Sequence, residues 1–375
     1  MRIAQISPLM ESVPPKLYGG TERIVSYLTE ELVRQGHDVT LFASGDSQTL
    51  AELVPCSPRA LRLARVHDPM PYNILQLNHV LKRSDEFDIL HFHNDCLHFP
   101  FMRNSAATAV TTLHGRLDLP DLPPLFREFD DMPLVSISAH QRRPLSANWV
   151  ATVHHGLPSE LYSSSHDGQG NYLAFLGRVC PDKGLDRAIE IAHRAGYPLK
   201  IAAKVDKVDQ AYFDDVIVPL LGKPNIEFIG EIGEDQKAAF LGKAKALLFP
   251  IDWPEPFGLV MIEAMACGTP VIAWPCGSVQ EIIEPGVTGF VVDSVQDALI
   301  ALKQVDSLSR NLVRKRFEAR FTAELMARNY LRVYRALLDR RTMPTSKIKA
   351  PASLALIKPV NGSGKAYASV QRDLL

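Results

Sequence analysis

Short apolar runs alternate with amphipathic stretches along most of the chain. In the first half these runs predict strands at Arg2–Ser7, Asp38–Ala43, Asp88–His93, Ala109–Leu113, Leu134–Ser138 and Val150–His154. In the second half they predict strands at Tyr172–Leu176, Leu199–Ala203, Ile226–Ile229, Ala246–Pro250, Pro270–Ala273 and Phe290–Val292. Runs that lack polar alternation are typical of parallel strands buried on both faces. The regular alternation of strand and helix therefore predicts two α/β units with six strands each.

A polar segment divides the two halves of the chain. Residues 161–171 are rich in Ser and Gly, a composition typical of linkers. From Arg310 to about Arg340, apolar residues recur at helical spacing and predict one long helix. Residues 342–375 are rich in Pro, Ser, Gly, Ala and Lys, which predicts a disordered tail.

Composition and charge exclude several classes of protein. The 375 residues are 46% hydrophobic and 22% charged, which is ordinary for a globular protein and excludes disorder as the main state. A net charge of −1 provides no overall field that would attract nucleic acid or an anionic membrane. The sequence has no apolar run long enough to span a bilayer, and Pro8 interrupts the first apolar run before a signal-peptide core forms. The five cysteines are scattered, which fits reduced thiols and predicts a cytoplasmic protein. The near-zero net charge predicts that it has no nucleic-acid partner.

Two loops carry phosphate-binding features directly before a predicted helix. Gly19 and Gly20 follow the first strand and open a helix, where free amides and a partial positive charge favour a phosphate. Their spacing matches neither a dinucleotide-binding fingerprint nor a Walker A loop, and an ordinary glycine turn is the alternative. Arg178 and Lys183 bracket a second loop and could neutralise a diphosphate without a metal, with a solvated charged loop as the alternative. Its position after a parallel strand favours a ligand site.

The segment from Trp253 to Pro270 is the most informative part of the sequence. Gly258 begins a predicted helix that is apolar on every face except at Glu263. A buried carboxylate needs hydrogen-bond donors, and the vicinal hydroxyls of a sugar would supply two. Glu255, on the preceding proline-containing loop, could reach a neighbouring part of the same ligand. The alternative is that Glu263 pairs with a core arginine or a backbone amide.

These motifs together resemble the retaining glycosyltransferases of family 4, which have the GT-B fold. The resemblance is carried by the G-R-x(4)-K loop, the E-x(7)-E pair, Gly277 to Ile283, Gly286, Thr288-Gly289-Phe290, Gly19-Gly20, Leu113-His114-Gly115 and Gly156. It covers all of the chain except the tail. His154-His155-Gly156 departs from the Asn-Gly pair of many members, which puts the detail of the interdomain hinge in doubt.

The resemblance implies an α/β architecture of two Rossmann-like parallel-sheet domains that face each other across a cleft. Residues 1–160 would form the acceptor domain, 161–171 the linker and 172–318 the nucleotide-sugar domain, with 319–341 crossing back to the first domain. In this family Glu263 would bind the ribose hydroxyls, while Arg178 and Lys183 would bind the diphosphate. The other implied roles are the donor sugar for Glu255, Phe257, Gly258 and Leu259, the base for Ile229-Gly230-Glu231, the phosphate for Gly19 and Gly20, and the region of the anomeric carbon for His114.

The implied reaction moves a hexose from a nucleoside-diphosphate sugar, UDP-glucose-like by family frequency, to an unidentified hydroxyl acceptor. It would proceed with retention of configuration and without a metal or other cofactor. Cations on the departing diphosphate would supply electrostatic catalysis. Front-face attack is the usual description, and a covalent intermediate on Glu255 is the alternative. A nucleotide-sugar epimerase on the same fold and a non-catalytic protein that binds sugar nucleotides remain open as other functions.

Three further segments bear on metals, the acceptor and membranes. His91 and His93 share one face of a strand, but no zinc-ligand spacing matches, so no metal site is predicted. Residues 118–133 follow His114-Gly115 and are expected to line the acceptor side. Residues 310–350 carry an excess of nine positive charges. A solvated helix face is the preferred interpretation, and weak contact of this helix and the tail with an anionic membrane surface is the alternative.

Overall fold

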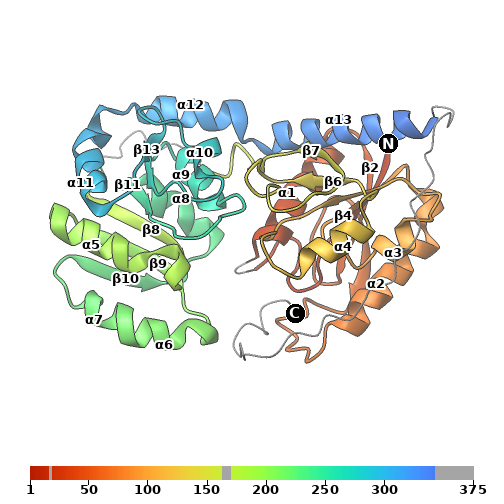
Figure 1. Ribbon diagram of the computed structural model, residues 1–375, viewed down its shortest axis with the longest axis horizontal. Coiled ribbons are helices and arrows are strands. Elements are labelled where there is room, and N and C mark those ends of the chain that lie inside the picture. The colour runs from red at the N-terminus through yellow and green to blue at the C-terminus, as the bar shows by residue number, and fades with distance from the viewer. Residues whose placement is uncertain (17–18, 163–169, 343–375) are drawn as a thin grey trace, which may run out of the picture.

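The computed structural model describes residues 1–16, 19–162 and 170–342, which form two parallel β-sheets with helices on both faces (Figure 1). The first sheet has seven strands in the order β3-β2-β1-β4-β5-β6-β7, and the second has six in the order β10-β9-β8-β11-β12-β13. Both orders reverse direction at their first strand, β1 or β8, as in doubly wound folds. The predicted architecture of two Rossmann-like sheets is confirmed.

The elements have the following bounds. The strands are β1 (Arg2–Ile6), β2 (Asp38–Ser44), β3 (Glu52–Ser57), β4 (Ile89–Phe92), β5 (Ala109–Thr112), β6 (Leu134–Ser136), β7 (Trp149–Thr152), β8 (Tyr172–Arg178), β9 (Leu199–Lys204), β10 (Ile226–Gly230), β11 (Ala244–Phe249), β12 (Val271–Ala273) and β13 (Gly289–Val291). The helices are α1 (Gly20–Arg34), α2 (Met70–Lys82), α3 (Phe99–Met102), α4 (Leu122–Glu128), α5 (Leu185–Ala195), α6 (Gln210–Tyr212), α7 (Val218–Leu221), α8 (Glu234–Gly242), α9 (Leu259–Ala266), α10 (Val279–Ile282), α11 (Val295–Gln304), α12 (Arg310–Arg320) and α13 (Ala323–Thr342).

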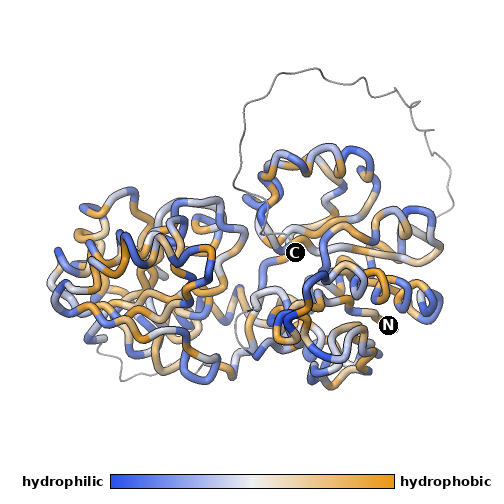
Figure 2. The backbone as a smooth tube through the Cα atoms, turned by 90° about the horizontal axis from the view of Figure 1, so that it is seen from below, coloured by the Kyte–Doolittle hydropathy of each residue, from blue (hydrophilic) through white to orange (hydrophobic). Residues whose placement is uncertain are grey.

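Each sheet lies within its own apolar core, and Figure 2 shows the apolar segments gathered inside two lobes. The strands are short, and central ones such as β1 and β11 are almost wholly buried, which explains their continuous apolar sequences. The prediction of six strands in the first half is wrong, because the first sheet has seven and β3 was not predicted. Strand β3 lies at the edge of its sheet and contains Pro55, which an edge strand tolerates because one side makes no ladder hydrogen bonds.

The prediction of one helix from Arg310 to Arg340 is also wrong, because the chain breaks between α12 and α13. At the break, the amide of Leu157 donates to Phe321 O at 2.9 Å, and the amide of Ala323 donates to Leu157 O at 2.8 Å. A methyl group at Gly156 would lie only 2.2 Å from the carbonyl oxygen of Thr322, so this close approach requires glycine. The two passages of the chain between the domains, 154–157 and 321–323, are therefore bonded to each other. We call this pair of segments the double crossing.

Beyond the break, α13 runs along the first domain, as Figure 1 shows. Tyr330 and Tyr334 are fully buried in a core that includes Ile3, Ile24 and Val110. The predicted return of the C-terminal helix to the first domain is confirmed by this packing.

Several basic residues of α12 are engaged inside the protein. Arg310 donates to the carbonyl oxygens of Gly242 and Ala244 at 2.7 and 2.8 Å. Arg314 donates to the carbonyl oxygen of Ala266 at 2.6 Å, and Arg320 pairs with Glu284 at 2.7 Å. These three arginines thus satisfy carbonyl groups and a carboxylate of the second domain rather than forming a free basic surface.

The predicted tail beyond residue 342 and most of the predicted linker, residues 163–169, lie outside the described residues. Within the part of the chain that the structure describes, no helix combines the length and the apolar character that a membrane span requires.

Candidate active site

The loop between β11 and α9 brings Lys183 and Glu255 together. The Lys183 ammonium donates to Oε2 of Glu255, and the Trp253 indole donates to the same oxygen at 2.9 Å. The ammonium also lies 4.5 Å from the centroid of the Trp253 ring, a cation–π contact. Only 10% of the Glu255 side chain is exposed. An anionic ligand at this loop would compete with Glu255 for Lys183.

Two glycines in positive-φ conformations shape this loop. Gly258 has φ +75° directly before α9, and a methyl group there would lie 2.7 Å from Cε of Met261. Gly277 has φ +63°, and its Cβ position lies 2.2 Å from the carbonyl oxygen of Glu255. No side chain caps the start of α9. The first amides of α9 are therefore available to an anion at the same loop that carries Glu255.

Glu263 is buried in α9 and is paired with a lysine. Its side chain is 4% exposed, and Lys237 Nζ of α8 donates to its Oε1 at 2.8 Å. Lys237 also pairs with Glu234 at 3.1 Å, and Glu234 pairs with Arg23 of α1 at 2.7 Å. The sequence predicted sugar hydroxyls as the partners of Glu263, with a core arginine or a backbone amide as the alternative, and the partner within the protein is the ammonium group of Lys237. We call Arg23, Glu234, Lys237 and Glu263 the charge network.

Neighbouring opposite charges keep Lys237 and Glu234 ionised. Burial would lower the pKa of Lys237, but the carboxylates of Glu263 and Glu234 outweigh this effect and raise it. Burial would raise the pKa of Glu234, but Lys237 and Arg23 outweigh this effect and lower it. Lys237 was not predicted from the sequence. The lone acid in an apolar helix signalled that a partner is needed but did not say where the partner lies.

Arg178 and Gly230 lie at the carboxyl ends of β8 and β10, the two strands that flank β9 in the second sheet. Arg178 ends β8 and lies 3.8 Å from a carboxylate oxygen of Asp206 and 3.6 Å from one of Asp209. Its side chain is 37% exposed. Gly230 ends β10 with φ +78°, and its Cβ position has no atom within 4 Å. Both residues thus border open space at the strand ends, where a ligand of an open α/β sheet is expected.

In the first domain, His114 follows β5 and takes part in a buried chain of hydrogen bonds. Its Nε2 lies 2.9 Å from Nδ1 of His93, and Nε2 of His93 lies 2.8 Å from Oε1 of Gln5. Nδ1 of His91 lies 2.7 Å from the hydroxyl of Tyr334. Burial lowers the pKa of His114 to about 3, so its imidazole is neutral at pH 7. His91 and His93 are thus hydrogen-bonded core residues, and the described residues contain no cluster arranged to hold a metal ion.

Predicted residues of the two domains come together where the domains meet. The His114 ring stacks on that of His155, with centroids 5.3 Å apart, and His155 contacts the Phe257 ring at 4.9 Å. A methyl group at Gly20 would lie 3.7 Å from Cδ1 of Leu259. His155, which the sequence suggested as part of a hinge, therefore also links His114 to the loop of Glu255.

The glycine pair and the expected acceptor loop border the same region. A methyl group at Gly19 would lie 2.8 Å from Cβ of Pro15, so the turn before α1 has no room for a side chain. At the start of the expected acceptor loop, Arg116 pairs with Asp118 at 2.7 Å and lies 6.0 Å from the centroid of the Trp253 ring. Residues 118–133, for which an acceptor role is predicted, thus begin beside the loop that carries Glu255.

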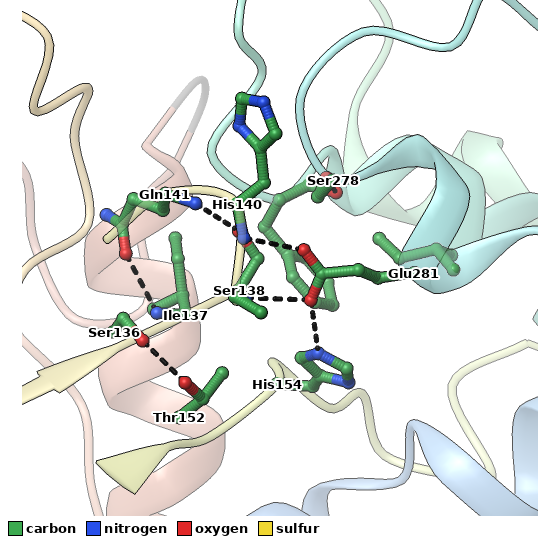
Figure 3. Close-up of polar contacts among 12 residues, drawn as sticks. Ser136, Ile137, Ser138, His140, Gln141, Thr152, His154, Ser278 and Glu281 are labelled. Atoms are coloured by element: carbon green, nitrogen blue, oxygen red, sulfur yellow. Dashed lines mark hydrogen bonds and ion pairs between the residues drawn. The ribbon is translucent and has the colours of Figure 1, made fainter. Parts of the chain in front are cut away.

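A second carboxylate of the second domain contacts the first domain (Figure 3). Glu281 of α10 accepts hydrogen bonds from the amides of Ala139 and His140 at 2.8 and 2.7 Å, and it lies 3.3 Å from Nε2 of His154. Burial would raise the pKa of Glu281, but the hydrogen bonds from His154 and the two amides outweigh it and lower this pKa. Glu281 thus joins the domains as a carboxylate.

Comparison with protein families matches both halves of the chain. The model described as glycosyl transferases group 1 matches residues 160–320, and the model described as glycosyltransferase family 4 matches residues 18–181. Phosphatidyl-myo-inositol mannosyltransferase of Mycobacterium leprae is 25% identical over 388 residues, which is 89% of this chain and 96% of that protein. O-antigen chain mannosyltransferase C of Escherichia coli is 22% identical, over 88% of this chain and 97% of that protein.

Solved structures of the same fold cover nearly the whole chain. Sucrose-phosphate synthase from Thermosynechococcus elongatus superposes with a TM-score of 0.74 at 18% identity and covers 91% of this chain and 100% of its own. Anabaena HepE in complex with UDP and glucose gives a TM-score of 0.69 at 18% identity, over 90% and 100% of the two chains. With its two facing sheets, its returning C-terminal helix and matches to both halves of the sequence, the chain belongs to glycosyltransferase family 4, on the GT-B fold.

Proposed function

We propose that this protein transfers a hexose from a nucleoside-diphosphate sugar to a hydroxyl acceptor, with retention of configuration and without a bound metal. The observation that supports the proposal most directly is the contact of His114, through His155, with the Phe257 loop that follows Glu255. A donor sugar held at Glu255 would then lie beside His114, at the boundary where an acceptor from the first domain can reach it.

The charges of the site fit the departure of a diphosphate. When the bond between the anomeric carbon and the phosphate breaks, the electron pair stays on the diphosphate oxygen. Lys183, Arg178 and the free amides at the start of α9 would stabilise that charge. Lys183 would exchange Glu255 for a phosphate oxygen, which leaves the Glu255 carboxylate to accept hydrogen bonds from the donor sugar.

His114 would bind and orient the donor rather than protonate it. Since burial lowers its pKa to about 3, its imidazole holds no extra proton to give to the leaving group at pH 7. In a front-face reaction the acceptor hydroxyl forms the new bond at the anomeric carbon, and its proton passes to the departing diphosphate oxygen. Glu255 as a covalent nucleophile is the alternative, which trapping of a glycosylated Glu255 would reveal.

The names of the relatives favour a hexose as the transferred group. Two of them are mannosyltransferases, and one solved structure holds UDP and glucose. We propose a UDP-glucose-like donor and take GDP-mannose as the comparison donor. The protein would act in the cytoplasm on an unidentified acceptor.

A thermal-shift series with UDP, GDP, ADP and the corresponding sugar nucleotides tests the donor site. A ligand that binds only the folded state stabilises it and so raises the melting temperature. At a free ligand concentration of about a hundred times Kd, the stabilisation is about 2.7 kcal/mol. We expect one nucleotide to raise the melting temperature of the wild type, and Glu263→Ala and Arg178→Ala to reduce that rise. If no nucleotide changes the melting temperature, the proposed function is wrong.

The same donors separate transfer from the two other functions. An epimerase would convert the donor alone into an epimer, which nuclear magnetic resonance of the sugar ring protons detects. A non-catalytic binding protein would bind the donor and release no nucleoside diphosphate with any acceptor or with water. Release of the nucleotide together with a sugar that keeps its anomeric configuration supports the retaining transferase.

A further inference from the structure

The charge network connects the two domains, and Glu263 is its last member in the second domain. Glu263 lies in α9, Glu234 and Lys237 lie in α8, and Arg23 lies in the first turn of α1, three residues after Gly20. The successive N–O distances are 2.8 Å from Lys237 to Glu263, 3.1 Å from Lys237 to Glu234 and 2.7 Å from Arg23 to Glu234. The network therefore extends from Glu263 in the second domain to the first turn of α1 in the first domain, directly after Gly19 and Gly20.

The four groups are mostly buried and alternate in charge. The exposed fractions of their side chains are 10% for Arg23, 21% for Glu234, 15% for Lys237 and 4% for Glu263. Two cations and two anions leave no net charge, so each ion is compensated by its neighbours. Removing one member of such a set leaves an unpaired buried charge, which is strongly unfavourable. Loss of one member therefore leaves the charge of its neighbour uncompensated.

The geometry at Glu263 leaves one of its two oxygens to a ligand. Lys237 donates to Oε1, and this contact fixes the rotation of the carboxylate group. Oε2 can then accept a hydroxyl in a defined direction, while Oε1 retains lone-pair capacity for a second hydroxyl. Tyr162, from the segment just before residue 163, donates to Glu234 and holds the middle of the network from a third side.

We propose that Lys237 is a positioning residue for the donor nucleotide, which holds the Glu263 carboxylate in the direction that the ribose hydroxyls require, and that Arg23 ties this arrangement to the first domain through Glu234. The proposal rests on the function proposed above. It assigns to α8 a role in recognising the ribose. The same ion pairs would then both orient Glu263 for the ribose and hold α1 against the donor domain.

The discriminating measurement compares ribonucleotide with 2′-deoxyribonucleotide binding. Isothermal titration calorimetry with UDP and dUDP, GDP and dGDP, and ADP and dADP gives the ratio of Kd values for each pair. We expect the wild type to bind its preferred ribonucleotide about tenfold or more tightly than the deoxy form, since a hydrogen bond to a carboxylate is worth at least that factor. In Lys237→Met this ratio should fall to about threefold or less because the carboxylate loses its fixed direction.

Three variants separate positioning from a general loss of structure. Lys237→Arg keeps the cation and should retain the ratio. Lys237→Gln, which keeps a donor without the charge, should reduce the ratio and serves if the Met variant does not fold. Lys243→Met is the matched control, because Lys243 is exposed at the end of the same helix, and its ratio should equal that of the wild type.

The link to the first domain has its own test. Arg23→Met and Lys237→Met, measured singly and together for binding of the preferred ribonucleotide, form a double-mutant cycle. Coupled residues should give a combined effect that departs from the product of the single effects by about twofold or more. Effects that multiply would show that Arg23 does not act through Lys237 and would overturn that half of the proposal.

The failures of the two proposals are distinguishable. If no nucleotide binds the wild type, or if Glu263→Gln keeps the full ribose preference, the proposed donor site is wrong and the positioning role with it. If Glu263→Gln loses the preference while folded Lys237→Met and Lys237→Gln keep it, the donor site stands and the role of Lys237 is refuted.

Discussion

The contact of Glu281 with the first domain allows a quantitative prediction. In Glu281→Gln the side chain keeps its shape but loses its charge and one of its two acceptor oxygens. The amides of Ala139 and His140 donate to different oxygens of Glu281, so one amide keeps a neutral acceptor and the other faces the NH2 group and loses its hydrogen bond. A hydrogen bond to a charged group contributes about 1.5–3 kcal/mol and one between neutral groups about 0.5–1.5 kcal/mol. The first change costs about 1 kcal/mol and the second about 1.5–3 kcal/mol, so the two amides together should lose about 3 kcal/mol at pH 7.

Thermal unfolding at several pH values measures this loss. For a domain of 150–250 residues, 1 kcal/mol corresponds to about 2–4 °C, so Glu281→Gln should melt about 6–12 °C below the wild type at pH 7. Glu190→Gln, which loses only an exposed pair with Arg194, is the control and should change stability by less than about 0.5 kcal/mol.

The pH dependence gives the sign of the effect. Because the pKa of Glu281 is lowered in the folded protein, its contribution is fully present above its unfolded pKa. The contribution is lost as the pH falls through the folded pKa. The difference between wild type and Glu281→Gln should accordingly shrink at acidic pH. Equal melting temperatures at pH 7, or a difference that does not shrink in acid, would refute the reasoning.

Four further predictions follow from the site and the crossing. Lys183→Met should lower kcat for transfer more than it weakens nucleotide binding, by about 10²-fold or more, because it removes a cation from the leaving group; steady-state kinetics beside calorimetry checks this, and equal effects on both would contradict it. Gly156→Ala should destabilise the protein by about 1–3 kcal/mol, because the added methyl group would lie 2.2 Å from Thr322 O. Gly115→Ala, whose Cβ position has no atom within 4 Å, should leave the melting temperature unchanged, and similar shifts in both variants would argue against the clash. Replacement of residues 118–133 should change the use of acceptors and spare hydrolysis of the donor, and equal loss of both activities would count against an acceptor role. In sedimentation with phosphatidylglycerol vesicles, the protein should show no salt-sensitive binding, since many of the basic residues of this segment already have partners within the protein, namely Arg310, Arg314, Arg316, Arg320 and Arg328; salt-sensitive binding would instead support the membrane interpretation.

The fold was predictable because buried parallel strands leave a strong local signal. Runs such as Ala244–Phe249 are buried along their whole length, so their sequences are continuously apolar. Strand β3 left no such signal, since it is half exposed and contains Pro55. The break between α12 and α13 was invisible for another reason. Phe317, Phe321 and Leu325 continue the helical spacing across it, and the hydrogen bonds that hold the break come from distant Leu157.

The site was predictable only where a single residue in its local sequence shows that it requires a polar partner. A carboxylate in the apolar helix α9 must be hydrogen-bonded or paired, so Glu263 could be recognised from the sequence. The identity of that partner depends on how α8 packs beside α9, and nothing in the sequence around Lys237 distinguishes it from other surface lysines. Similarly, His155 reads as part of a hinge, and its contact with both His114 and Phe257 exists only because the two domains meet there.

The double crossing determines how the two domains can turn. Two bodies joined at two distant points would be locked together, whereas the chain here passes between them twice at one place, where Leu157 is bonded to both Phe321 and Ala323. The paired backbones form one connection, so bending it would move both passages together. A change in the angle between the lobes would also have to break the contacts of Glu281 with the amides of Ala139 and His140 and of Arg23 with Glu234. The crossing thus sets where the lobes can bend, and these polar contacts oppose the bending.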